Sequence, residues 1–202
     1  MKLFYSSASP YARKCWIVAL EAGFGERLVT VPTTVTPHQP DRAFAQKNPL
    51  VKIPVLERDD GSVLYDSAVI CEYLDAEARA GLFPPAGEAR WQALRRHALA
   101  DGIMDACLLA RYETLYRPEA LRWTAWVEGQ YAKIDNGLDA FEHEVDGLGE
   151  AFLIDQIALA CALGYLDFRF AARDWRPGRP RLARWFAQRS QRESVRRTFP
   201  TA

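Results

Sequence analysis

The chain has no excess of charge of either sign. Its 202 residues contain 26 Lys and Arg against 26 Asp and Glu, so the formal net charge at pH 7 is zero. A neutral chain creates no overall field that attracts nucleic acid or an acidic membrane surface. No apolar run approaches the roughly 20 residues that a membrane span needs, and the N-terminus shows no signal-peptide pattern. We therefore expect a cytoplasmic protein with no nucleic-acid and no membrane partner.

The sequence also lacks the short motifs of several common enzyme classes. No His-Glu-x-x-His, Cys-x-x-Cys, P-loop or Gly-x-Gly-x-x-Gly pattern occurs, so the usual signals of zinc hydrolases, nucleotide hydrolases and dinucleotide oxidoreductases are absent. The cysteines are far apart, and each lies in an apolar helical pattern: Cys15, Cys71, Cys107 and Cys161. We interpret them as buried, reduced side chains and expect neither a disulfide framework nor a metal site.

Strand and helix patterns alternate over the first part of the chain. Short apolar strands are expected at residues 2–5, 28–31, 51–57 and 63–65, and helical spacing of apolar residues follows the first and the last of them. A turn sequence between the last two strands predicts a hairpin. Pro54 lies near the start of one hairpin strand, and because proline cannot donate to a strand ladder it indicates an edge, a bulge or a cis peptide bond.

No strand pattern returns after a cluster of glycine and proline at residues 81–87. Apolar residues then recur at helical spacing, and residues 153–170 are apolar on most faces, which is typical of a central buried helix. We therefore predict an α+β protein of two domains. A βαβ-ββα domain spans residues 1–79, a linker residues 80–88, and an all-helical domain residues 89–202.

The dipeptide Ser9–Pro10 marks the start of the first helix. Serine is a favoured N-cap, proline fits the first helical position, and Gly23 can supply a left-handed stop. Capping is the ordinary use of this pair. The helix dipole stabilises an anion there by about 0.3 to 1 kcal/mol, which lowers the pKa of a bound thiol by at most about one unit. A hydrogen bond from a hydroxyl donor stabilises the thiolate by roughly 1.5 to 3 kcal/mol more. Asp66–Ser67 repeats the arrangement, so two helix N-termini can face one polar ligand.

Three further features have a structural and a functional interpretation. His38 lies in a loop rich in Thr and Pro and is either a ligand contact or an exposed side chain. Asp155, near the start of the buried helix, is expected to be structural, with its carboxylate bonded to main-chain amides. Nine arginines between residues 173 and 197 form a basic segment, which we interpret as a solvated tail packed beside an acidic partner rather than a nucleic-acid site.

Several segments, in their order along the chain, resemble the soluble glutathione S-transferases. They are Ser9-Pro10-Tyr11, the stretch from Asn48 to Leu56, and Asp66-Ser67, followed by the all-helical half. Segments at residues 100–106, 160–166 and 192–194 place the resemblance within a bacterial branch of that family. The resemblance covers nearly the whole chain and implies a thioredoxin-like N-terminal domain, an all-helical bundle as the C-terminal domain, and a homodimer.

The resemblance also implies a glutathione site with no metal. Ser9 matches the small residue that faces the glutathione sulfur in this family. The bond Ile53–Pro54 is expected to be cis, which leaves the Ile53 backbone free to pair with the cysteinyl part of glutathione. Asp66–Ser67 matches the pair that binds the γ-glutamyl end, and Asp101 or Asp105 can reach across a dimer interface toward the γ-glutamyl amine.

The implied activity is transfer of glutathione to a small electrophile, a detoxification reaction, with reduction of a peroxide as a second use of the same thiolate. Ser9 stabilises the thiolate and is never the nucleophile. The neighbouring hydroxyl groups of Tyr5, Ser6, Ser7 and Tyr11 compete for that role. His38 counts among the candidate glutathione contacts through its loop position.

An alternative is a non-catalytic interaction module with the same fold, for example one that associates with RNA polymerase. The complete tripeptide site favours the enzyme, although fold alone does not fix function. Tyr112, Tyr116 and Trp123 are candidates for the wall of the electrophile pocket, in competition with ordinary packing. One departure from the family pattern occurs at Phe152, three residues before Asp155, where Ser or Thr usually completes a capping box.

Overall fold

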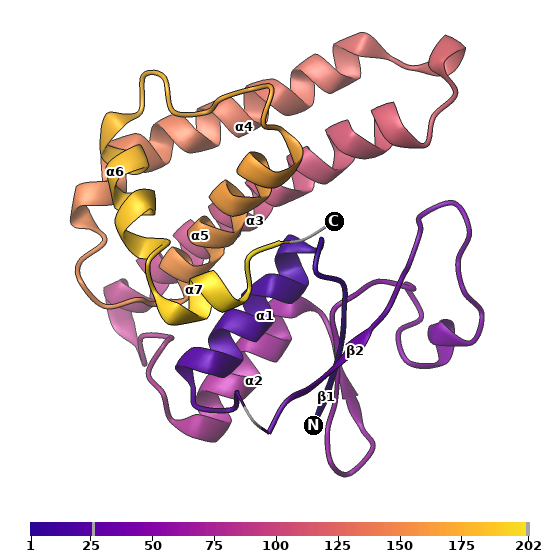
Figure 1. Cartoon of the computed structure of the whole chain (residues 1–202). Coiled ribbons are helices and arrows are strands. Elements are labelled where there is room, and N and C mark those ends of the chain that lie inside the picture. The colour runs from indigo at the N-terminus through magenta and orange to yellow at the C-terminus, as the bar shows by residue number, and fades with distance from the viewer. Residues whose placement is uncertain (26, 201–202) are drawn as a thin grey trace.

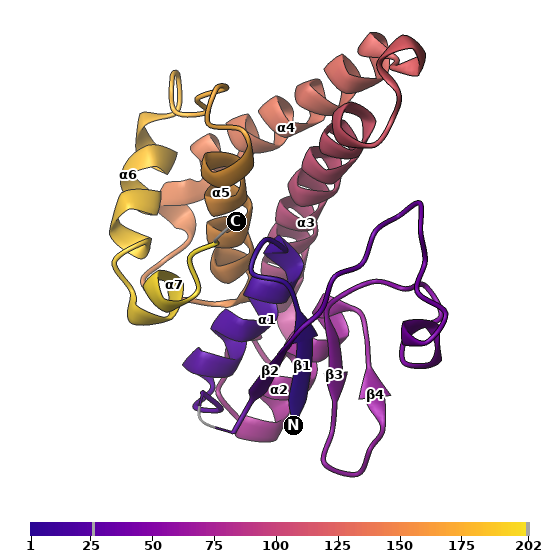
Figure 2. The same cartoon turned by 45° about the vertical axis from the view of Figure 1, so that its right-hand side comes forward.

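The computed structural model describes residues 1–25 and 27–200, and its architecture is the predicted α+β fold. The first part contains, in chain order, β1 (Lys2–Tyr5), α1 (Pro10–Glu21), β2 (Val29–Pro32), β3 (Val55–Glu57), β4 (Val63–Leu64) and α2 (Ser67–Ala78). The strands form one sheet in the order β2-β1-β3-β4, with β2 parallel to β1 and both hairpin strands antiparallel to their neighbours. Helices α1 and α2 lie side by side between this sheet and the rest of the chain (Figures 1 and 2).

The second part consists of helices in its described residues. They are α3 (Gly87–Leu115), α4 (Thr124–Glu144), α5 (Ile154–Arg169), α6 (Pro180–Arg189) and α7 (Glu193–Arg197), with short 3₁₀ turns η1 (Phe44–Gln46), η2 (Glu119–Leu121) and η3 (Val145–Gly147) along the chain. Helix α5 is buried along most of its length and lies between α1 and the remaining helices (Figure 1). The prediction of a thioredoxin-like domain followed by a helical bundle is confirmed. No described helix combines the length and apolar character that a membrane crossing requires.

Local sequence signals fix the ends of α1 as predicted. The Ser9 hydroxyl oxygen accepts a hydrogen bond from the backbone N–H of Ala12 at 3.3 Å, and Pro10 is the first helical residue. Gly23 has φ +78°, a left-handed conformation that favours glycine and ends the helix. The structure therefore places a helix N-terminus directly after β1.

Three predicted strands differ in their boundaries from the structure. The strand expected at residues 63–65 is β4 and ends at Leu64. The strand expected at residues 28–31 lies at Val29–Pro32, because β2 continues its parallel pairing until Pro32 stands opposite Tyr5. The strand expected at residues 51–57 begins only at Val55. The preceding bond, Ile53–Pro54, is cis, and a proline without an N–H group cannot extend the ladder.

The connection between the sheet part and the helices is short and anchored. Helix α2 ends at Ala78 and α3 begins at Gly87, close to the predicted linker at residues 80–88. The buried Asp75 carboxylate accepts hydrogen bonds from the N–H groups of Leu82 and Phe83 at 2.7 and 3.1 Å, which holds this segment against α2. The division into domains at residues 1–79 and 89–202 stays a prediction.

The carboxylate of Asp155 lies at the start of α5, almost fully buried. One oxygen accepts from the N–H group of Gln156 at 3.0 Å and the other pairs with Nε of Arg96 at 2.7 Å. The N-cap residue Leu153 makes no side-chain cap, in line with the incomplete capping box. Instead, the Gln156 side-chain amide donates to the Leu148 carbonyl at 2.9 Å. A buried ion pair and an amide therefore anchor this helix start.

The basic C-terminal segment has acidic partners within the chain itself. Seven of its nine arginines form ion pairs with carboxylates of the described residues: Arg173, Arg176, Arg179, Arg181, Arg189, Arg192 and Arg197. Several of these carboxylates, such as Asp135 and Glu142, belong to α4, and Glu21 belongs to α1. The acidic partner expected from the sequence is thus an intramolecular surface.

A buried lysine connects α1 to the long helix α3. The Lys14 ammonium is fully buried, and its Nζ atom lies 2.7 Å from both carboxylate oxygens of Asp101 and 2.8 Å from Nε2 of His97. A protonated lysine has three donors and no acceptor, so these three contacts satisfy it completely. The two domains are therefore joined by a satisfied polar cluster inside an apolar interface.

Electrostatics determine the charge states in this cluster. Burial alone lowers the pKa of Lys14, but the Asp101 carboxylate outweighs burial and the net pKa is raised. Burial and the neighbouring ammonium of Lys14 lower the pKa of His97 to about 3. His97 is therefore neutral at pH 7, with Nε2 as an acceptor and its proton on Nδ1.

We predict that His97 makes the folded state acid-sensitive. Between about pH 6.5 and 3 the unfolded state binds a proton at His97 that the folded state excludes, so stability falls with decreasing pH by up to about 1.4 kcal/mol per pH unit. His97→Gln keeps an acceptor for Lys14 and removes this titration. Urea unfolding at several pH values is expected to give a shallower pH dependence for the variant. Equal slopes for both proteins would contradict the assignment.

Candidate functional site

Strand register brings the predicted site residues to one end of the sheet. Because β3 runs antiparallel to β1, with Val55 opposite Phe4, the start of β3 lies beside the end of β1. Strand β4 runs antiparallel to β3, with Leu64 opposite Leu56, so β4 ends at the same end of the sheet. Ser9 follows β1, Ile53–Pro54 precedes β3, and Asp66–Ser67 follows β4. Three loops separated by dozens of residues therefore converge at this edge (Figure 2).

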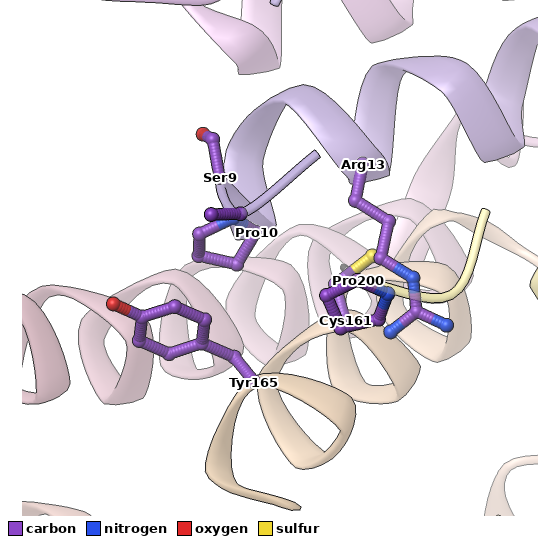
Figure 3. Close-up of a pocket in the computed structure, with 7 residues that line it drawn as sticks. Ser9, Pro10, Arg13, Cys161, Tyr165 and Pro200 are labelled. Carbon is purple, nitrogen blue, oxygen red and sulfur yellow. The ribbon is translucent and has the colours of Figure 1, made fainter. Parts of the chain in front are cut away.

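The Ser9 hydroxyl has a proton available for donation. Its oxygen accepts from the N–H group of Ala12, and its proton goes to no acceptor in the described part of the chain. The side chain is half-buried at the N-terminus of α1. Figure 3 shows it pointing away from Cys161 and Pro200, which lie on the other side of Pro10. A hydroxyl that accepts at a cap and still holds its proton can donate to an anion at the helix N-terminus.

Among the competing hydroxyl groups, that of Tyr11 already has a hydrogen-bond acceptor within the chain. Its phenol donates its single proton to the Asp105 carboxylate in a short hydrogen bond. Burial and this carboxylate both raise the pKa of Tyr11. The Ser6 hydroxyl accepts from the N–H group of Ala8 at 3.3 Å, within the loop before α1. Ser9 remains the hydroxyl that combines the cap position with a free proton.

The segment before β3 presents backbone polar groups at the same edge. Pro54 is buried, and the Ile53–Pro54 peptide bond is cis, as the family resemblance implied. Within residues 1–25 and 27–200, neither the N–H nor the C=O group of Ile53 takes part in a hydrogen bond. A half-buried residue with an unpaired donor and acceptor can pair with an extended peptide.

The second helix N-terminus has a carboxylate at its cap. Asp66 is exposed, and one of its oxygens accepts from the N–H group of Ala68 at 3.0 Å. Ser67 is the first residue of α2 and is buried, and its carbonyl oxygen lies 3.6 Å from the Cys15 sulfur. The outer oxygen of Asp66 and the first amide groups of α2 are thus available to a ligand that carries both an ammonium and a carboxylate group.

The Thr- and Pro-rich loop contacts the far end of α3. The His38 ring lies 4.7 Å from the ring of Tyr116, which in turn lies 5.4 Å from the ring of Tyr112. His38 is thus exposed yet packed on an aromatic pair of the helical domain. Trp123 follows Tyr116 in the chain, is 65% exposed, and stacks on Trp126.

Asp101 and Asp105 both have partners within the chain. Asp101 binds Lys14, and Asp105 accepts from Tyr11. Neither contact was foreseen from the sequence, because Lys14 lies outside the apolar stripe of α1 and its burial depends on α3. A contact from either carboxylate to glutathione in a partner subunit stays a prediction.

Behind Ser9, α1 packs tightly on α5 and on the C-terminal segment. The lining residues of this pocket, which has no room for a water molecule, are Ala8, Ser9, Pro10, Arg13, Cys161, Tyr165 and Pro200 (Figure 3). Arg13 donates from Nη2 to the Val195 carbonyl at 3.1 Å and from Nε to the Thr198 hydroxyl at 3.3 Å. A Cβ atom at Gly164 would lie 2.2 Å from Nη1 of Arg13, so a larger residue there would displace the Arg13 guanidinium group.

No group of three or more His, Cys, Asp or Glu side chains suited to a metal ion occurs among the described residues. The four cysteines are buried and free. The described groups at the sheet end are a hydroxyl group, two helix N-termini and a carboxylate.

Comparisons with known proteins find relatives over nearly the whole chain. Residues 8–77 match the family profile described as glutathione S-transferase, N-terminal domain, and residues 124–188 match the C-terminal domain of the same family. The uncharacterized GST-like protein YibF of Escherichia coli (strain K12) is 37% identical over 99% of this chain and 98% of its own length. The resemblance predicted from the sequence is confirmed.

Solved structures are similar over the whole chain. A crystal structure of a glutathione transferase family member from Pseudomonas fluorescens Pf-5 with bound glutathione is 45% identical, has a TM-score of 0.96, and covers 100% of this chain and 99% of that chain. A further crystal structure of such a protein from the same organism, with bound S-(propanoic acid)-glutathione, is 43% identical, has a TM-score of 0.92, and covers 99% of both chains.

We predict that capping by Ser9 is separable from its hydroxyl chemistry. Ser9→Ala is expected to lower the free energy of unfolding by about 1 kcal/mol, whereas Ser9→Gly costs only a few tenths, because glycine is tolerated at an N-cap. Urea denaturation of both variants tests this order. A Ser9→Gly variant less stable than Ser9→Ala would show that the hydroxyl does not cap the helix.

Proposed function

The chain belongs to the glutathione S-transferase family, and we propose that it binds glutathione and transfers it to a small electrophile. The observation that carries this proposal is that three loops with polar groups available to a ligand converge at one end of the sheet. Ser9 offers a hydroxyl proton, Ile53 an unpaired backbone and Asp66–Ser67 a capped helix N-terminus. Each loop suits a different part of the tripeptide.

In the proposed complex, glutathione lies extended across the sheet edge. The backbone of Ile53 pairs with the cysteinyl residue in an antiparallel manner, since its N–H and C=O groups are otherwise unpaired. The γ-glutamyl carboxylate takes the amide groups at the start of α2 and the Ser67 hydroxyl, and its ammonium approaches Asp66. His38 remains a proposed contact from the loop above.

The proposed role of Ser9 is to hold the sulfur as a thiolate. The dipole of α1 contributes about 0.3 to 1 kcal/mol, less than one pKa unit, so the direct hydrogen bond from the hydroxyl is the larger contribution at roughly 1.5 to 3 kcal/mol. The thiolate then attacks the electrophile, and serine forms no mixed disulfide. Conjugation is therefore favoured over thiol transfer.

A thioether product is supported by a relative. The Pseudomonas fluorescens protein that is 43% identical to this chain was crystallised with S-(propanoic acid)-glutathione. The sulfur of that conjugate is bonded to carbon, and we propose carbon electrophiles for this chain. Reduction of a peroxide uses the same thiolate, and no contact in the described site favours it.

The basic C-terminal segment gives the interaction-module alternative little support. Its arginines are mostly paired with carboxylates of α1, α4 and neighbouring residues, so few are available to another protein. The family membership also leads us to propose a cytoplasmic homodimer, in which Asp101 or Asp105 approaches glutathione bound to the partner subunit.

Calorimetry tests glutathione binding directly. We predict binding by the wild type and an affinity at least about 10-fold weaker for Asp66→Asn, because asparagine keeps the N-cap and removes the charge that faces the ammonium group. Asp59→Asn, on the exposed hairpin turn, is the matched control with unchanged affinity. A wild type that does not bind glutathione would exclude the proposed enzyme.

The thiolate absorbance of bound glutathione tests the role of Ser9. Titration with the wild type and with Ser9→Gly is expected to show a thiol pKa about 1 to 2 units higher in the variant, the equivalent of one lost charged hydrogen bond. Tyr11→Phe, which removes a hydroxyl already bound to Asp105, is expected to leave this pKa unchanged. A thiol pKa that is raised in Tyr11→Phe and unchanged in Ser9→Gly would instead assign the stabilising role to Tyr11.

A further inference from the structure

Two half-buried arginines of the helical domain have no carboxylate partner among the described residues. Arg111 belongs to α3 and Arg169 is the last residue of α5, and both are half-buried. Neither guanidinium group forms an ion pair or a hydrogen bond in the part of the chain that the structure describes. The other helical-domain arginines without an ion pair there, Arg122, Arg184 and Arg196, are exposed, so these two partly buried cations need an explanation.

Helix geometry directs both arginines toward the site. Arg111 lies four residues after the buried Cys107, and Arg169 lies four residues after the buried Tyr165, so each shares a helix face with a residue of the α3–α5 interface. Tyr165 lines the pocket at Ser9 together with Cys161 (Figure 3). One helical turn is about 5.4 Å, which places Arg169 about one turn beyond Tyr165 and the Ser9 pocket.

The charges of the two arginines act on each other and on the phenol of Tyr165. Burial raises the pKa of Tyr165 to about 12, and the positive charges of Arg111 and Arg169 oppose this shift. Burial lowers the pKa of Arg169, and repulsion from Arg111 lowers it further. Two cations thus repel one another across a neutral phenol, and an anion bound between them would relieve the repulsion.

The side chain of Arg169 is also held in place. Its guanidinium carbon lies 3.8 Å from the centre of the Phe168 ring. Stacking on an aromatic face orients a guanidinium group and leaves its N–H donors free at the edge. A planar group with free donors suits a carboxylate, whose two oxygens match the arginine fork.

We propose that Arg111, Arg169 and Tyr165 bind the carboxylate of the electrophile, so that the enzyme acts on carboxylate-bearing electrophiles such as α,β-unsaturated carboxylates. This inference rests on the proposed transfer of glutathione. The electrophilic carbon then lies between the carboxylate subsite on the helical domain and the sulfur at Ser9. The sheet domain supplies the nucleophile and the helical domain selects the acceptor.

The chemistry of this addition balances without a further reactant. The glutathione thiol releases its proton to solvent, and the sulfur forms a bond to the β-carbon of the acceptor. The electron pair of the C=C bond moves toward the α-carbon and the carboxylate, and the α-carbon then takes a proton from solvent. Negative charge on the carboxylate grows in the transition state, so two arginines stabilise the transition state more than the bound substrate.

The test compares two glutathione conjugates of equal length by calorimetry on the intact chain. S-(2-carboxyethyl)glutathione carries the extra carboxylate, and S-propylglutathione replaces it with a methyl group. The wild type is expected to bind the carboxylate conjugate about 10- to 100-fold more tightly, equal to about 1.4 to 2.8 kcal/mol at about 1.4 kcal/mol per factor of ten. Arg111→Gln and Arg169→Gln are each expected to remove most of this preference.

Controls separate this inference from the proposed function. Arg184→Gln, which removes an exposed arginine of α6, is expected to keep the full preference, and all three variants are expected to bind unmodified glutathione as the wild type does. Equal affinity of the wild type for both conjugates, with normal glutathione binding, would overturn this inference alone. Failure of the wild type to bind glutathione would overturn the proposed function as well. The wild-type comparison needs no variant, so it stands even where a substitution impairs folding.

Discussion

The buried ammonium group of Lys14 is the interaction on which the arrangement of the two halves depends. It lies in α1, is fully buried, and directs its three donors to both oxygens of Asp101 and to His97 on α3. Removing one member of such a cluster leaves an uncompensated charge or polar group in the interface, which typically costs about 3 to 5 kcal/mol. The N-terminus of α1 is part of the candidate site. This one contact therefore fixes the site relative to the helical domain.

The position of α1 gives its two ends different tasks. Its first turn carries Ser9 at the sheet edge, where Ile53 and Asp66 converge through strand register. Its next residues, Arg13 and Lys14, are buried against α5, the C-terminal segment and α3. In the proposed site, the nucleophile lies on one domain and the acceptor surface on the other. Selection of the electrophile can then change through helical residues without disturbing glutathione binding.

Signals that act within a few residues were predictable from the sequence. Ser9–Pro10 and Gly23 fixed the ends of α1, and the proline near the start of a strand correctly indicated a cis bond among its alternatives. The ordered motifs indicated the family and hence the fold. Contacts between distant residues were not predictable, because they depend on helix packing. Lys14 and Asp101 are 87 residues apart, and the stacking of His38 on Tyr116 follows from where a loop and a helix end meet.

In the proposed complex, the Ser9 hydroxyl holds the sulfur of glutathione at the N-terminus of α1. A crystal structure of the chain with bound glutathione would show the position of the sulfur. We expect the sulfur within hydrogen-bonding distance of the Ser9 oxygen, the cysteinyl backbone paired with Ile53 and the γ-glutamyl end at Asp66–Ser67. A tripeptide whose sulfur is directed to another hydroxyl, or a glutathione molecule bound elsewhere, would contradict this role of Ser9.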